Sequence, residues 1–251
     1  MIKLNIMIRY KIIIEYDGTN YVGWQKQDNG PSIQEAIESA IFKQSGEKIE
    51  LFGAGRTDAG VHALSQVAHF DIEKNFSEDS IRDGLNKHLR PQPIAILHAE
   101  KVNQTFHARF SAKQRHYSYT IVNRRSPLTI EKNFAWIVHK KLDTVLMRDA
   151  SKLFLGNHDF NAFRSINCQS KSSVKTIDFF DVTLENNKII FRVKARSFLH
   201  SQVRIMVGTL VYVGEKKFGI EDVKQIIRDS DRNKAGPTAP SQGLCLVEVT
   251  Y

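Results

Sequence analysis

Residues 51–63 read LFGAGRTDAGVHA, a composition typical of a tight glycine-rich turn that carries one acidic side chain, Asp58. Small residues allow such a turn to bring its backbone close to a substrate. The spacing excludes a dinucleotide-binding fingerprint, because Asp58 stands where the third glycine belongs, and it excludes a P-loop, which ends in Lys-Ser or Lys-Thr. Spacing alone favours a turn-capping Asp58, hydrogen-bonded to nearby backbone, over a catalytic one.

Predicted strands and helices lie on both sides of this turn. Apolar residues at every second position from Leu4 to Tyr16 predict a strand with one buried face. Ser32, with Glu35 three residues later, forms a capping box that predicts a helix. The remaining elements of this N-terminal half are strands over 64–71 and 94–101 and a helix that begins near Ser77.

A similar order of elements is predicted beyond residue 110. It comprises a strand over 116–122, a helix over 143–155, a hairpin over 178–196 turned at Asn186-Asn187, a helix from about Phe198 to Val213, a shorter helix over 221–228 and a final strand over 244–251. No sequence repeat accompanies this order, so a duplicated architecture and two unrelated α/β halves are both open. We predict an α+β protein with an N-terminal half, residues 1–110, and a C-terminal half, residues 111–251.

The composition is that of an ordinary globular protein with a basic excess. With 36 basic and 27 acidic residues, the net charge is +9, which indicates a polyanionic partner or a surface of scattered, solvated cations. The two cysteines, Cys168 and Cys245, lack the spacing of a zinc site, so we expect neither a metal nor a disulfide. We also expect a cytoplasmic protein without a membrane span, because the N-terminus lacks a signal peptide's apolar core.

Several stretches together resemble one enzyme family. Residues 53–62 match, without a gap, the pattern G-x-G-R-T-D-x-G-V-H of the catalytic loop in the TruA family of tRNA pseudouridine synthases. Further stretches similar to the family occur in the same order, namely 16–25, 103–110, 117–119, 156–164 and 235–244. One departure is Gln202, which stands where the family usually has Met in F-L-x-x-M-V-R, whereas Arg204 of that motif is retained.

The resemblance implies both a fold and a reaction. The expected pseudouridine synthase fold joins two similar mixed α/β halves through a largely antiparallel central sheet, with helices on the outside. The expected activity is the isomerisation of uridine to pseudouridine in tRNA, on the 3′ side of the anticodon stem-loop, by a homodimer whose two subunits share one tRNA. The reaction breaks a C–N glycosidic bond and joins ribose C1′ to uracil C5, so no cofactor is expected.

The resemblance also assigns roles to four residues. Asp58 is the expected nucleophile, and Arg204 is expected to keep it ionised, since an arginine at about 4 Å favours a carboxylate by roughly 4 kcal/mol at an effective dielectric constant of about 20. Arg56 is expected to fill the space that the extruded uridine leaves, although a surface or turn-bracing arginine is the alternative. Tyr117 is expected to lie against the uracil, although Tyr117 and Tyr119 share one strand face and both fit a core.

His62, four residues after Asp58, is interpreted as a structural histidine rather than a catalytic base, because the reaction has no obvious need for a second activating group. A basic groove for tRNA phosphates is a further hypothesis, with an ordinary solvated strand face as its alternative. Its residues are Arg109, Lys113, Arg115, Arg124, Arg125, Arg192, Lys194 and Arg196.

Two other functions remain open from the sequence. The first is a catalytically inactive RNA-binding protein on the same scaffold, and the second is a carboxylate-dependent enzyme that acts on free nucleosides or sugars. The presence of all four residues, Arg56, Asp58, Tyr117 and Arg204, favours the tRNA-modifying enzyme.

Overall fold

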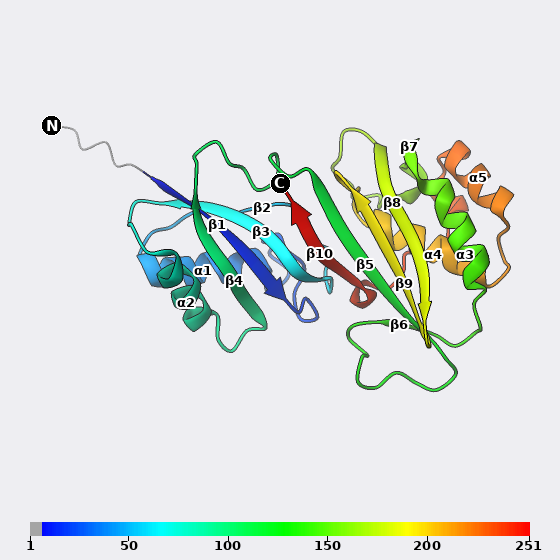
Figure 1. The fold of residues 1–251 in the computed structure, drawn as a ribbon, viewed down its shortest axis with the longest axis horizontal. Coiled ribbons are helices and arrows are strands. Elements are labelled where there is room, and N and C mark those ends of the chain that lie inside the picture. The colour runs from blue at the N-terminus through cyan, green and yellow to red at the C-terminus, as the bar shows by residue number, and fades with distance from the viewer. Residues whose placement is uncertain (1–6) are drawn as a thin grey trace. The chain divides into compact units, whose positions relative to one another are not determined.

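The structure, a computed structural model, describes residues 7–251 and contains two compact units. The first unit comprises the described residues up to Lys113 together with Leu246–Tyr251, and the second comprises Gln114–Cys245 (Figure 1). Each unit packs helices against a largely antiparallel set of strands, which confirms the α+β class. The assignment of residues 1–110 and 111–251 to two functional halves stays a prediction.

The first unit is built on strands in the order β4-β1-β3-β10. These strands are β1 (Ile8–Tyr16), β3 (His62–Ile72), β4 (Ile94–Val102) and β10 (Leu244–Thr250), and the short β2 (Phe52–Gly53) pairs with β3. Helices α1 (Ile33–Ser45) and α2 (Glu78–Leu89) pack against each other, and α2 also packs on β4.

The predicted periodicities account for these elements. The alternate residues of β1 are at most 3% exposed, as expected for a strand with one buried face; they are Tyr10, Ile12, Ile14 and Tyr16. The predicted strand positions Leu4 and Ile6 lie outside the described residues. Ser32 and Ser77 cap α1 and α2, since each side chain accepts a backbone N–H three residues later.

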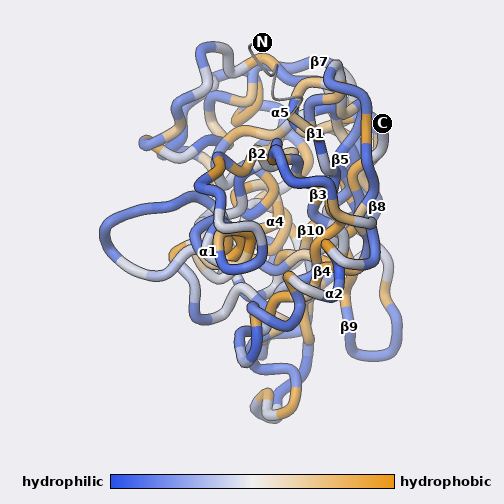
Figure 2. The backbone as a smooth tube through the Cα atoms, turned by 90° about the vertical axis from the view of Figure 1, so that its left-hand side faces the viewer, coloured by the Kyte–Doolittle hydropathy of each residue, from blue (hydrophilic) through white to orange (hydrophobic). Residues whose placement is uncertain are grey.

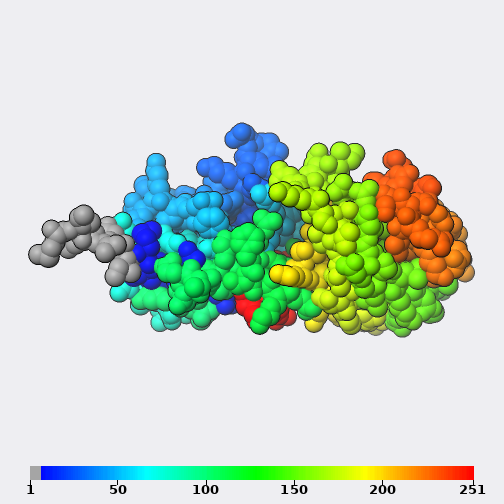
Figure 3. All heavy atoms as spheres, turned by 90° about the horizontal axis from the view of Figure 1, so that it is seen from above, coloured from blue at the N-terminus to red at the C-terminus, as the bar shows by residue number. Residues whose placement is uncertain are grey.

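The second unit has strands in the order β5-β9-β8-β7, with the short β6 parallel to β5. They are β5 (Gln114–Asn123), β6 (Trp136–Val138), β7 (Gly156–Asp159), β8 (Val174–Glu185) and β9 (Lys188–Ala195). The predicted hairpin is confirmed, because β8 and β9 turn at Asn186, whose φ of 58° is left-handed. The helices are α3 (Thr144–Ser151), α4 (Gln202–Gly214) and α5 (Ile220–Asp229), of which α5 lies on the surface (Figure 3).

Helix α4 is the central helix of this unit and is apolar along most of its length (Figure 2). It begins at Gln202 rather than at Phe198, so the predicted start was wrong by four residues. Ser201 adopts a left-handed conformation, with φ 60° and ψ 11°, and this breaks the helical path. Leu199 is nevertheless buried, because the turn before the helix also faces the core.

Gln202, which replaces the Met usual in the family, holds this turn. Its side chain is 1% exposed, and Oε1 accepts the Leu199 N–H at 2.8 Å. The backbone N–H of Gln202 donates to the Leu199 carbonyl at 3.1 Å. The buried Nε2 has no hydrogen-bond partner among residues 7–251, and an unsatisfied buried donor lowers stability.

We expect Gln202→Met to change the free energy of unfolding by less than about 1 kcal/mol, because the lost hydrogen bond and the removed unsatisfied donor have opposite effects of similar size. Gln202→Ala should cost about 2 kcal/mol or more, because it also leaves a cavity. Urea-induced unfolding measures both. A cost for Gln202→Met as large as that for Gln202→Ala would contradict the assignment of Nε2 as unsatisfied.

Candidate active site

Asp58 lies on the loop between β2 and β3, and backbone hydrogen bonds fix this loop to residues 16–24. The Trp24 N–H donates to the Thr57 carbonyl at 3.1 Å, and the Gly60 N–H donates to the Tyr21 carbonyl at 3.3 Å. The Val61 N–H donates to the carbonyl of Asp58 itself at 3.2 Å. The position of Asp58 is therefore set by main-chain bonds on both sides of it.

Two glycines allow these segments to approach so closely. A Cβ at Gly23, whose φ is +114°, would lie 2.5 Å from the Thr57 carbonyl oxygen. A Cβ at Gly18 would lie 2.0 Å from the Val61 carbonyl oxygen. Neither contact is possible for another residue without moving backbone. The family-like stretch around Gly18 and Gly23 thus serves as the support of the Asp58 loop.

Side chains in the middle of the loop differ sharply in exposure. Thr57 is buried, and its Oγ1 shares a hydrogen bond with the Tyr16 hydroxyl at 2.8 Å. Asp58 is half-buried and Arg56 is exposed. Thr57 anchors the loop in the core, which leaves the guanidinium of Arg56 accessible two residues before the carboxylate.

His62, which follows the Asp58 loop in sequence, binds the segment that supports the loop. Its side chain is buried, and Nδ1 accepts the Gly18 N–H at 3.1 Å. The same nitrogen lies 3.1 Å from Oδ1 of Asp17. These contacts agree with the interpretation of His62 as a structural histidine.

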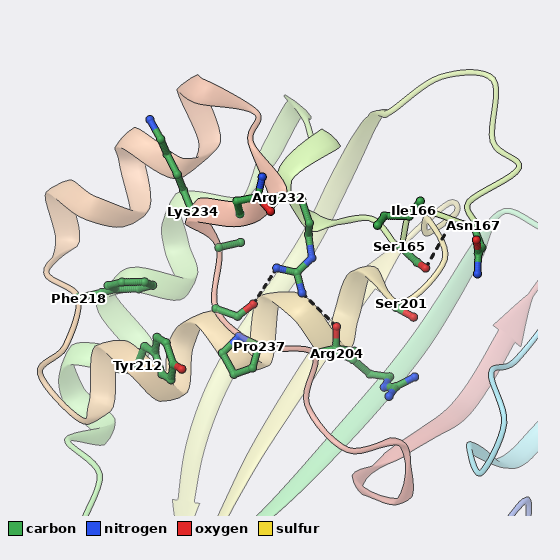
Figure 4. Close-up of a pocket in the computed structure, with 14 residues that line it drawn as sticks. Ser165, Ile166, Asn167, Ser201, Arg204, Tyr212, Phe218, Arg232, Lys234 and Pro237 are labelled. Carbon is green, nitrogen blue, oxygen red and sulfur yellow. Dashed lines mark hydrogen bonds between the residues drawn. The ribbon is translucent and has the colours of Figure 1, made fainter.

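Arg204 lies in the first turn of α4, in the second unit. Its Nε donates to the Ala239 carbonyl at 2.8 Å, and the Ala239 N–H donates to the Arg204 carbonyl at 3.1 Å. Arg204 lines a cavity of about 1050 Å³ formed by residues of this unit alone (Figure 4). Polar and aromatic residues share its lining, among them Ser165, Ser201, Tyr212, Phe218 and Arg232.

Segment 235–240 crosses α4 and positions the Ala239 carbonyl, which accepts the hydrogen bond from Nε of Arg204. Nη1 of Arg232 donates to the Gly236 carbonyl at 3.0 Å, and its Nη2 donates to Oγ1 of Thr238 at 3.1 Å (Figure 4). The Gly236 N–H in turn donates to Oγ1 of the buried Thr209 at 3.0 Å. Arg232 and Thr209 thus fix the segment that binds Arg204.

No pattern in the sequence pointed to Arg232 or Thr209. Both act on backbone groups of a neighbouring loop, and such bonds leave no periodicity or motif. The only available signal was the position of Arg232 just before the family-like stretch that begins at Ala235. Burial lowers the pKa of the Arg232 guanidinium.

The two tyrosines of β5 have different environments. Tyr119 is fully buried, its hydroxyl donates to the Pro240 carbonyl at 2.7 Å, and burial raises its pKa. Tyr117 is 8% exposed, and its ring packs edge to face against the ring of Phe198, with 5.3 Å between the ring centres. Tyr119 is therefore a core residue that also holds the segment 235–240, which leaves Tyr117 as the substrate-binding candidate of the pair.

The predicted basic strand face is partly engaged within the second unit. Arg192 donates to Glu185 at 3.0 Å, and Lys194 lies 5.9 Å from the centre of the Phe179 ring. Arg196 lies beyond the end of β9. The tRNA groove built on these residues stays a prediction.

Among residues 7–251, no group of three or more His, Cys, Asp or Glu side chains is arranged to hold a metal ion. Over the same residues, none of the helices is long and apolar enough to cross a membrane.

Comparisons with known proteins agree on one family. The family model described as tRNA pseudouridine synthase matches residues 12–111 and 150–251. The tRNA pseudouridine synthase A of Afipia carboxidovorans is 52% identical over 245 residues, which cover 98% of this chain and 100% of that protein. The protein of the same name from Ehrlichia ruminantium (strain Gardel) is 53% identical over 97% of this chain and 100% of its own length.

A solved Cbf5–Nop10–Gar1 complex is more distant. One chain of that complex aligns with 80% of this chain over 45% of its own length, with 12% sequence identity and a TM-score of 0.36. This likeness is too weak to carry an argument.

The close packing of α4 under segment 235–240 predicts the effect of Gly208→Ala. In an ordinary helix this change stabilises by up to about 1 kcal/mol. Here the new Cβ would lie 1.8 Å from the Pro237 carbonyl oxygen, so we expect the free energy of unfolding in urea to fall by about 1–3 kcal/mol.

Gly84→Ala on α2 is the matched control. The three atoms nearest to its Cβ would belong to the amide end of Gln44, at 2.4–2.6 Å, and that flexible side chain can move. We expect this variant to be as stable as the parent or more stable. Equal stabilisation by both alanines would show that segment 235–240 is not held against α4.

Proposed function

The chain belongs to the tRNA pseudouridine synthase family, and from this premise we propose that it uses the carboxylate of Asp58 to isomerise uridines on the 3′ side of the anticodon stem-loop. Membership makes it an isomerase of uridine in tRNA. The assignment of Asp58 is supported by its loop. The loop matches the family's catalytic pattern and is fixed by main-chain hydrogen bonds on both sides of Asp58.

The reaction needs an ionised carboxylate by any of three routes. Asp58 attacks ribose C1′, attacks uracil C6, or removes a ribose proton to form a glycal. In each route the C1′–N1 bond breaks, the uracil turns within the site, C1′ joins C5, the C5 proton is released and N1 takes up a proton. Any bond from Asp58 to C1′ or C6 breaks again, and a ribose proton removed on the glycal route is returned. A covalent or proton-transfer step at one carboxylate divides this exchange into easier steps, and the fixed loop holds the carboxylate in place for it.

We assign substrate binding to Arg56, Tyr117 and Arg204. Arg56 is exposed beside Asp58, and its planar guanidinium suits it to fill the stack that an extruded uridine leaves. Tyr117 offers a ring held by Phe198, against which uracil can lie. Arg204 carries a positive charge on a side chain whose Nε is bound to Ala239.

Two further parts of the proposal rest on the family resemblance. The chain acts as a homodimer in which one tRNA contacts both subunits, and it acts in the cytoplasm. The net charge of +9 supports binding to a large polyanion such as tRNA.

Asp58→Asn should abolish pseudouridine formation, with a loss in kcat of at least about 10³-fold, because the amide cannot act as a nucleophile or base. Binding of tRNA and the free energy of unfolding should remain near the parent values, since the side chains are nearly isosteric. Release of tritium from C5-labelled uridine in tRNA measures turnover directly. Substantial release by this variant would refute the assignment.

Tyr117→Phe should keep most of the turnover, because the ring and its edge-to-face contact with Phe198 remain. Tyr117→Ala should lower kcat/KM by roughly 5- to 150-fold, the usual effect of removing an aromatic ring that stacks on a base. The same tritium assay compares the two variants. If both lose turnover equally, the hydroxyl rather than the ring is the important group.

A further inference from the structure

An aromatic surface in the first unit takes no part in the chemistry proposed above. Phe110 is 71% exposed and Phe52 is 37% exposed. The ring of His107 lies between them, with its centre 4.5 Å from that of Phe110 and 5.6 Å from that of Phe52. We call Phe52, His107, Arg109 and Phe110 the Phe110 platform.

The backbone beneath this surface is fixed to the core. Ala108 is fully buried, its N–H donates to Nδ1 of His69 at 3.1 Å, and its carbonyl accepts the Tyr251 hydroxyl at 2.8 Å. Nδ1 of His107 accepts the Arg109 N–H at 3.1 Å. The platform therefore keeps its aromatic rings in a preformed arrangement, and Phe110 is not the tip of a loose loop.

Positive charge accompanies these rings. The guanidinium carbon of Arg109 lies 5.6 Å from the centre of the Phe110 ring. Partial burial, together with the charges of Arg9 and Arg109, lowers the pKa of His107. The lowered pKa favours the uncharged form of His107, and the same two cations favour an anion near the platform.

We propose that the Phe110 platform binds an unpaired nucleobase of the RNA substrate by stacking, with the charge of Arg109 favouring the adjacent phosphate. The inference rests on the proposed function, because it takes tRNA as the substrate. Every base offers a π face, and exposed aromatic rings next to cations are the usual means of holding unpaired nucleotides.

The charge of the chain favours a base over a second copy of this chain. A net charge of +9 attracts a polyanion and repels a second copy, and Arg109 lies directly against the most exposed ring of the platform. Phe52 also belongs to β2, after which the chain enters the Asp58 loop. A base on the platform would therefore be held by the same unit that carries the nucleophile.

The test compares Phe110→Ala, Phe110→Leu and Phe110→Trp in the full-length chain, with binding of unmodified tRNA as the readout. Alanine and leucine should each raise the Kd by roughly 5- to 150-fold, because both lack a π face. Tryptophan should bind at least as tightly as the parent, and its fluorescence should be quenched by tRNA. Phe42→Ala, at a residue 47% exposed on α1, is the control and should leave the Kd unchanged.

Two results would overturn the proposal. Parental affinity in Phe110→Leu would show an apolar contact without stacking. Weaker self-association of Phe110→Ala in sedimentation, with unchanged tRNA binding, would show that the surface meets a second copy of the chain. Because binding is measured without turnover, a parent chain that binds tRNA but forms no pseudouridine would refute the proposed function and still test the platform.

Discussion

The close contact between the Asp58 loop and residues 16–24 is the constraint on which the first unit's chemistry depends. Main-chain bonds join Trp24 to Thr57 and Tyr21 to Gly60, and the absence of a Cβ at Gly23 leaves room for the Thr57 carbonyl. A carboxylate on an ordinary surface loop would lose much of its effect, since small displacements of a reacting group slow a reaction strongly. The fold therefore places Asp58 through backbone atoms, as the proposed role of its carboxylate requires.

The second unit also orients a charged side chain, Arg204, through backbone atoms. Segment 235–240 lies against α4 where Gly208 leaves room for the Pro237 carbonyl, and the Ala239 carbonyl then accepts Nε of Arg204. One side of the guanidinium is fixed by a neutral acceptor, which restricts its orientation without neutralising its charge. In both units a glycine admits a backbone segment, and that segment orients a charged side chain.

Sequence patterns predicted the parts of the structure that depend on periodicity and capping. The alternation of β1, the cap at Ser32, the start of α2 near Ser77 and the turn at Asn186 all follow from local residue types. The start of α4 was missed because Ser201 is left-handed, a conformation set by the tertiary contacts of its turn rather than by its type. Arg232 was missed because its partners, the Gly236 carbonyl and the Thr238 hydroxyl, belong to an irregular segment that no periodic pattern marks.

The shortest strand of the first unit, β2, shows why a site needs more than its motif. Two residues are too few to be recognised in a sequence, yet Phe52 and Gly53 pair with His69 and Ala68 and so fix where the Asp58 loop begins. The side chain of Phe52 belongs at the same time to the Phe110 platform. RNA held by that platform would be bound to the same strand that positions the proposed nucleophile, Asp58. Binding energy gained away from the reacting uridine would then reduce the entropy lost in placing it.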